Sequence, residues 1–305
     1  MAKITQRKVI KQGPNTLMIS LPIKWVQKNQ IKKGDDLNIE EQSTSLIISR
    51  GAIQNTGKST EIEFKEDTKD TLIRMAISNL YKKGYDTVTV KTSGDQVIPK
   101  IHKAVESLMG YEITDQQEGK LIIQDIAKEL DSEFDNYLKK TFFMMFELGR
   151  VVKEDFVSGK FDINQVSQLS TNIKKFSDVC KRAIAKNDIY PEKNKHLFLI
   201  IWTLEKIASE YLNCHRYAEK KFKKIEKEII EYLDEVSAFF RSYYDAFYNS
   251  AKFDIDALDK RKNYLYYEKA YILMEKTTQP ALVMHLATIA RWTFYLVPPL
   301  FWMEN

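Results

Sequence analysis

The sequence predicts a multidomain protein in which a small β-rich module and a small α/β segment precede an all-α body. Three observations support this fold class. The 305 residues exceed the length at which one hydrophobic core usually stops growing. Short β-rich runs alternate with turn residues near the N-terminus, whereas apolar residues recur every three or four positions in the second half. Glycine and proline, at 10 and 7 residues, are scarce, as expected for mostly helical structure.

Residues 1–50 are predicted to form the β-rich module. Gly13 and Pro14 mark a turn between two runs of strand-forming residues, and Gly34-Asp35 marks another. The polar stretch 51–60 contains two glycines and is predicted to be a linker. Strands are expected at residues 8–11, 17–22, 37–40 and 45–49, with a short helical patch over 23–29.

Residues 61–126 are predicted to form a small α/β domain with the order βαβαββ. Alternating polar and apolar residues indicate a strand at 61–64, and helical spacing from Leu72 to Leu80 indicates the first helix. The segment contains neither a phosphate-binding loop nor a cluster of catalytic residues. We therefore interpret it as a structural or regulatory domain.

Residues 131–303 are predicted to form a helical body of two consecutive three-helix units. Apolar residues from Leu138 to Phe156 are spaced four and three apart in turn, and two later stretches repeat this pattern. Each stripe places one apolar face along a helix, which is what a bundle needs. Breaks that separate the helices are expected at Ser158-Gly159, Asn187-Asp188, Asp254 and Gln279-Pro280.

The positive charge is concentrated at the N-terminal end. Residues 1–33 carry eight lysines and arginines and no aspartate or glutamate, a net charge of +8. Because the whole chain has a net charge of +5, the remaining residues together carry −3. A basic end on a slightly acidic body indicates binding to a polyanion such as DNA. A solvated basic surface without a ligand is the alternative.

Residues 7–35 resemble the AbrB/SpoVT family of DNA-binding modules. The features that carry the resemblance are the strand before Gly13, the strand ending in Pro22, one helical turn around Trp25 and the turn Ile31-Lys32-Lys33-Gly34-Asp35. The resemblance implies a swapped-hairpin homodimer that docks basic strands and loops onto DNA. The candidate DNA-binding residues are Arg7, Lys8, Lys11, Asn15, Thr16 and Lys24.

The turn departs from that family at one point. Many members have an arginine directly after the turn glycine, whereas Pro14-Asn15-Thr16 follow Gly13 here. We therefore expect contacts to phosphates from Arg7, Lys8 and Lys11 more than readout of bases by an arginine at the tip. A module that pairs two chains and no longer binds DNA remains the alternative.

The rest of the chain resembles archaeal-type PhoU proteins, in which an AbrB-like module precedes a PhoU-like helical region. The resemblance lies in residues 72–90, in residues 104–126 and in the two three-helix units that follow. It implies a role in regulating phosphate uptake. The carboxylate pairs that bind metal clusters in that family are poorly matched, because Glu205 is followed four residues later by Ser209 and Glu147 by Val151. We therefore predict no bound metal and no cofactor.

Together these features predict a dimeric transcriptional regulator of phosphate uptake, with DNA on the N-terminal module and sensing by the helical body. The alternative is a PhoU-type adaptor that controls a phosphate transporter or its sensor without binding DNA. An antitoxin-like component fits less well, because antitoxins are commonly short. No enzyme is expected, since no nucleophile–base pair is recognisable.

The predicted location is the cytoplasm. Cys180 and Cys214 lack the CxxC spacing of a metal or redox site and are interpreted as buried thiols in a reducing compartment. No signal peptide is predicted. No membrane span is expected either, because the longest apolar run, 294–302, contains two prolines and is far shorter than about 20 residues.

Overall fold

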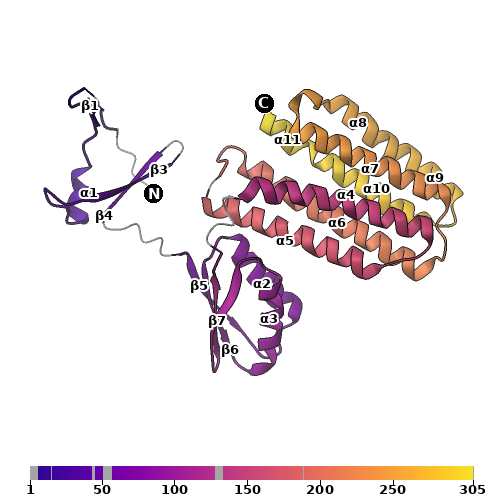
Figure 1. Cartoon of the computed structure of the whole chain (residues 1–305), viewed down its shortest axis with the longest axis horizontal. Helices are drawn as coiled ribbons and strands as arrows, with labels where there is room; N and C mark the ends of the chain where they lie inside the picture. Colours follow the sequence, from indigo (N-terminus) through magenta and orange to yellow (C-terminus); the bar gives the residue numbers. More distant parts are fainter. Residues whose placement is uncertain are drawn as a thin grey trace. The chain divides into compact units, whose positions relative to one another are not determined.

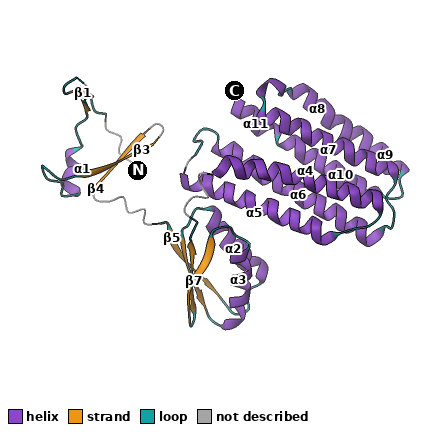
Figure 2. Cartoon of the chain, viewed as in Figure 1, coloured by secondary structure: helices purple, strands orange, loops and turns teal. Residues whose placement is uncertain are grey.

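The chain divides into two compact units, Met1–Gly57 and Lys58–Asn305 (Figure 1). The structure is a computed structural model, and it describes residues 6–14, 16–42, 45–50, 57–127, 133–187 and 189–304. A small β-rich unit at the N-terminus is followed by a mostly helical unit (Figure 2). This arrangement agrees with the predicted multidomain organisation. The two units are described separately below.

The N-terminal unit consists of two antiparallel hairpins and one short helix. Strands β1 (Ile10–Lys11) and β2 (Leu17–Met18) pair across the first turn, and β3 (Leu37–Gln42) and β4 (Ser45–Arg50) form the second hairpin. Helix α1 (Ile23–Lys28) lies between them in the sequence. The first two strands were predicted to be longer, at 8–11 and 17–22. A single copy of the module offers these segments only a two-residue ladder, and a strand needs a neighbour for each further hydrogen bond.

The second unit begins with a four-stranded sheet covered on one face by two helices. Its elements are β5 (Ser59–Phe64), α2 (Asp70–Lys82), β6 (Thr87–Thr92), a short 3-10 turn (Asp95–Val97), α3 (Ile98–Glu106), β7 (Tyr111–Gln117) and β8 (Lys120–Asp125). The strand order is β5-β6-β8-β7, with β5 and β6 parallel and the other pairs antiparallel. Because β5 begins at Ser59, the predicted linker of residues 51–60 loses its last two residues to this strand.

Alternation along these strands explains why only one face is covered. Val88 and Val90 of β6 and Leu121 and Ile123 of β8 are fully buried against α2 and α3. The residues between them, Thr89 and Ile122, are only partly buried, as expected when successive side chains point to opposite faces of a sheet covered on one side. Figure 1 shows both helices on the same side of the sheet.

The helical body follows. Helices α4 (Phe134–Ser158), α5 (Ile163–Asn187) and α6 (Asn194–Lys221) pack against one another. A second group consists of α7 (Lys227–Tyr248), the continuous helical stretch from α8 (Ile255–Asn263) through a π-helical segment (Tyr264–Lys269) to α9 (Ala270–Lys276), and α10 (Pro280–Tyr295). Helix α11 (Val297–Glu304) ends the described chain, and α10 packs along α6 to join the groups.

Local chemistry accounts for two of the helix ends. Gly159, at φ +68°, ends α4 in the left-handed conformation that glycine adopts without strain. The Asp254 side chain accepts a hydrogen bond from the Ala257 N–H and caps α8. One boundary differs from the predicted apolar stripes: Ile225 is buried in the connection between α6 and α7, before the helix to which its spacing assigned it.

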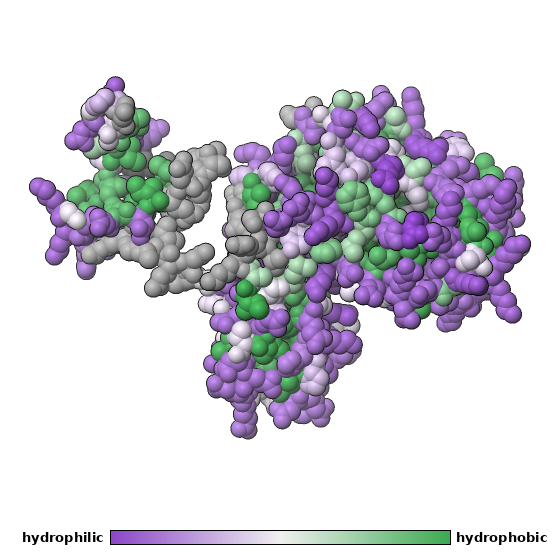
Figure 3. All heavy atoms as spheres, viewed as in Figure 1, coloured by the Kyte–Doolittle hydropathy of each residue, from purple (hydrophilic) through white to green (hydrophobic). Residues whose placement is uncertain are grey.

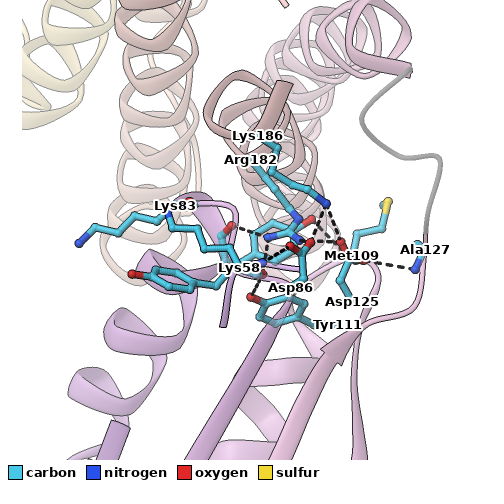
Figure 4. Close-up of polar contacts among 11 residues, drawn as sticks. Lys58, Lys83, Asp86, Met109, Tyr111, Asp125, Ala127, Arg182 and Lys186 are labelled. Carbon is cyan, nitrogen blue, oxygen red and sulfur yellow. Dashed lines mark hydrogen bonds and ion pairs between the residues drawn. The ribbon is translucent and has the colours of Figure 1, made fainter. Parts of the chain in front are cut away.

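A buried arginine joins the sheet domain to the helical body (Figure 4). Arg182 of α5 is only 1% exposed. Its Nη1 donates to the carbonyl oxygens of Tyr81 and Tyr85, at 2.9 and 2.8 Å. Its Nη2 donates to Asp86 Oδ1 and Asp125 Oδ2, at 3.0 and 2.6 Å. The guanidinium group therefore satisfies four acceptors from three segments of the α/β domain.

Two neighbours complete this junction. Lys186 Nζ lies 2.7 Å from Asp86 Oδ1 and 3.6 Å from Asp125 Oδ2, so both carboxylates have a second cation. The ring of Tyr111 packs against the guanidinium group of Arg182, and its hydroxyl donates to the Tyr85 carbonyl oxygen. Burial raises the pKa of Tyr111, which keeps this hydroxyl protonated as a donor.

Within the described residues, no helix is both long enough and apolar enough to cross a bilayer. Cys180 and Cys214 are both buried free thiols, as predicted from their lack of CxxC spacing.

Candidate nucleic-acid interface

The predicted DNA-binding residues lie on the first hairpin and on α1. Arg7 and Lys8 precede β1 and Lys11 lies on it, which corrects the prediction that the strand would begin at Lys8. Thr16 directly precedes β2, and its carbonyl oxygen accepts the Gln12 N–H at 2.9 Å. Lys24 lies on α1. All five side chains are exposed. Asn15, the sixth candidate, lies outside the described residues.

Gly13 determines the turn of the first hairpin. Its φ is +81°, a conformation that strains residues with a side chain. A Cβ atom built at this position would meet no other atom within 4 Å, so the backbone conformation and not packing requires glycine.

The turn after α1 exposes two further lysines. The Lys32 N–H donates to Asp35 Oδ2 at 2.9 Å, and the Asp35 N–H donates back to the Lys32 carbonyl oxygen at 3.1 Å. Gly34, at φ +94°, permits this tight reversal. Lys32 and Lys33 are therefore held on an exposed turn. These two lysines are not among the six predicted DNA-binding residues, although they belong to the basic stretch of residues 1–33 that contains no acidic residue.

All basic side chains that the structure describes between residues 6 and 34 are exposed, and no acidic residue lies among them in the sequence. Asp35 is the first acid of the chain, and it is engaged with the backbone of Lys32. The surface of this unit thus combines a dense positive charge with few neutralising carboxylates. The exposed basic residues are Arg7, Lys8, Lys11, Lys24, Lys28, Lys32 and Lys33.

The same unit leaves its apolar side chains in solvent. Leu17 is 71% exposed and Ile23 is 63% exposed, and none of the side chains described in this unit is buried. Apolar surface is visible on this unit in Figure 3. The side chains described in one copy of the module therefore do not form a hydrophobic core. The apolar side chains above two-fifths exposure are Val9, Ile10, Leu17, Met18, Ile19, Ile23, Ile39 and Leu46.

The carboxylates considered for a metal cluster have protein partners instead. Glu205 Oε1 lies 2.6 Å from Lys181 Nζ, and Glu147 binds Arg150 on the next turn of α4. Glu210 Oε1 lies 2.6 Å from His285 Nδ1. Among the residues that the structure describes, no three histidine, cysteine or acidic side chains are grouped as metal ligands would be.

Comparison with known proteins identifies a family for the N-terminal module. Residues 10–52 match the family model described as "Antidote-toxin recognition MazE, bacterial antitoxin". No curated protein and no solved structure matches the chain. The match begins at β1 and ends just after β4, so it spans both hairpins and α1. The chain therefore carries an N-terminal domain of the MazE/AbrB-like type.

Proposed function

We propose that this protein is a dimeric DNA-binding regulator whose N-terminal module contacts DNA. The observation that carries the proposal is the combination of seven exposed basic residues with a module whose described side chains form no core of their own. The charge provides the attraction for phosphates, and the missing core requires a second chain. The MazE/AbrB-like type of the module supports both parts, because such domains typically bind DNA and dimerise.

The energetics favour pairing of two modules. A domain of about fifty residues buries too little apolar surface to be stable alone. Burying one leucine or isoleucine side chain contributes roughly 1.5–3 kcal/mol. The eight exposed apolar side chains of each copy thus provide ample driving force for an intertwined dimer. In such a dimer the short ladder of β1 and β2 would gain a neighbouring strand from the second chain.

The chemistry of the surface favours phosphate contacts. Lysine and arginine side chains neutralise phosphates and release condensed counterions, which makes affinity fall as salt rises. The hairpin tip has no arginine after Gly13 that could contact guanine in a groove. We therefore infer that affinity comes mainly from the DNA backbone.

Replacing Arg7 and Lys8 together by alanine is expected to weaken binding to duplex DNA by at least about tenfold near 0.15 M salt. Each phosphate contact contributes about 0.9 to the slope of log K against log salt, so the slope should fall by about 2–4 for a dimer. Fluorescence anisotropy of a labelled duplex, measured over a range of salt concentrations, gives both values.

The matched control is Lys220→Ala with Lys221→Ala, which removes the same charge from an exposed position at the end of α6. This pair should leave the affinity and its salt dependence unchanged. Loss of binding in the control alone would place the DNA on the helical body. A dimer that shows no affinity for duplex DNA even at low salt would instead favour the adaptor function.

We further propose that the regulated genes serve phosphate uptake. The support is the resemblance of the body to PhoU proteins together with its two groups of packed helices, α4–α6 and α7–α10. DNA captured with the protein from cells grown with and without phosphate should be enriched near phosphate-transport genes, and the enrichment should change with phosphate. Enrichment at unrelated genes in both conditions would contradict the assignment.

A further inference from the structure

A groove on the helical body has the features of a small-molecule site. It lies between α4 and α7, has a volume of about 360 Å³, and reaches down to α6. This volume is at the lower end of the range for ligand pockets. The groove belongs entirely to the unit Lys58–Asn305, so the inference below does not rest on DNA binding.

Gly149 opens the floor of the groove. It lies inside the 25-residue helix α4, where glycine is less favourable than alanine. Its backbone does not have the positive φ that would require glycine. A Cβ atom at this position would lie 3.4 Å from Tyr211 Oη and 3.6 Å from Ser237 Oγ. The missing side chain therefore leaves space directly over two hydroxyl groups.

These two hydroxyls have hydrogen-bonding capacity to spare. Tyr211 Oη and Ser237 Oγ are 3.4 Å apart, longer than the 2.5–3.0 Å usual for a hydroxyl pair. Tyr211 is 2% exposed, and burial raises its pKa to about 12, so the phenol stays neutral. A polar group that enters over Gly149 can thus donate to or accept from both hydroxyls.

The walls are apolar and the rim is basic. Met145, Phe146 and Phe240 line the sides. Arg241 lies at the rim with its guanidinium group stacked on the Phe146 ring, 3.4 Å from the ring centroid. Among the described residues, Arg241 has no carboxylate within ion-pairing distance.

The other rim cations are already paired. Arg150 binds Glu147 and Glu154, and Lys153 Nζ lies 2.8 Å from Asp234 Oδ1. Within the described part of the chain, Arg241 is therefore the rim cation whose charge is open to a ligand.

We propose that this groove binds a small organic anion, a flat aromatic carboxylate with a neutral polar group at its far end. The polar group meets Tyr211 and Ser237 over Gly149. The ring packs against Phe146 and Phe240, where aromatic contacts favour it. The carboxylate pairs with Arg241, whose planar guanidinium group matches a carboxylate. Such a ligand contacts α4 and α6 of the first group of helices and α7 of the second.

The test titrates 4-hydroxybenzoate into the full chain by isothermal calorimetry, with 4-hydroxybenzamide as the neutral analogue. The benzoate should bind saturably with one site per chain, and the benzamide at least about tenfold more weakly. Arg241→Gln should weaken the benzoate by about tenfold or more. Gly149→Ala should weaken it as well, because its methyl group occupies the space over the hydroxyls.

Arg216→Gln is the matched control, since Arg216 is exposed on α6 and does not line the groove. It should bind 4-hydroxybenzoate as the unaltered chain does. Arg241 lies on the surface, so its variant stays folded and the test does not depend on the fate of Gly149→Ala. No saturable binding at millimolar concentration, equal affinity for the two probes, or full affinity in Arg241→Gln would each overturn the proposal.

Discussion

Replacing Arg182 with methionine is expected to lower the free energy of unfolding by about 3–5 kcal/mol, the usual cost of removing one partner from a buried ion pair. Methionine fills most of the volume but donates no hydrogen bond. The carbonyl oxygens of Tyr81 and Tyr85 then lose a buried donor. Asp125 loses its 2.6 Å ion pair and keeps the 3.6 Å contact to Lys186 and the hydrogen bond from the Ala127 N–H. Urea denaturation followed by circular dichroism measures this change.

The same substitution should act most strongly on the α/β domain. Arg182 reaches from α5 to the end of α2 and to the residues around β6 and β8. Hydrogen exchange followed by mass spectrometry should therefore show lost protection in α2 and β8, while α6 and α10 stay protected. Uniform loss throughout the unit would indicate that the domain and the body unfold together.

Arg150→Met is the matched control for Arg182→Met. Arg150 also binds two carboxylates, Glu147 and Glu154, but its side chain is 51% exposed. An exposed pair contributes little to stability, because water screens the charges. Equal losses of stability in the two variants would contradict the assigned importance of burial. Arg182→Lys should fall between them, since one ammonium group cannot reach all four acceptors.

Replacing Leu17 and Ile19 together by asparagine is expected to separate the dimer and to reduce DNA affinity by about a hundredfold or more near 0.15 M salt. Both side chains are at least half exposed in one copy, and burying amides without partners in a dimer interface costs free energy. Asparagine adds no charge, so the basic surface of each copy is unchanged. Sedimentation equilibrium reports the dimer and fluorescence anisotropy reports the affinity.

The salt dependence distinguishes loss of the dimer from local damage. A single module has half the phosphate contacts of a dimer, so the slope of log K against log salt should fall by about half. The control pair, Leu72→Asn with Met75→Asn, alters two exposed apolar side chains of α2 and should change neither measurement. A variant at Leu17 and Ile19 that remains dimeric and binds DNA normally would argue against this interface.

In the N-terminal module, local sequence signals predicted the turns but not the lengths of the strands. Gly13 and Gly34 both adopt positive φ in the turns where the sequence placed them, because turn chemistry acts within four residues. Strand length was overestimated at 8–11 and 17–22. Composition favours extended backbone there, but the number of ladder hydrogen bonds depends on a neighbouring strand that the local sequence does not specify.

In the helical body, too, local signals predicted the elements but not the contacts between distant residues. Apolar spacing predicted its helices, and Gly159, Asp254 and Pro280 lie at the ends they were expected to mark. Ile225 fits the stripe of α7 and yet precedes the helix. The Glu226 N–H donates to Gln279 Oε1, a contact across 53 residues that holds this connection and that no periodicity reveals.

The sequence by itself determined the helices, the turns and the basic, acid-free N-terminal end, because spacing, capping and charge are properties of neighbouring residues. Only the tertiary structure decided which distant groups meet. Arg182 contacts carboxylates 96 and 57 positions away, and Gly149 opens space over hydroxyls from α6 and α7. A buried arginine and a helical glycine look unremarkable in a sequence. Their roles come from packing, which brings acceptors or open space to them from elsewhere in the chain.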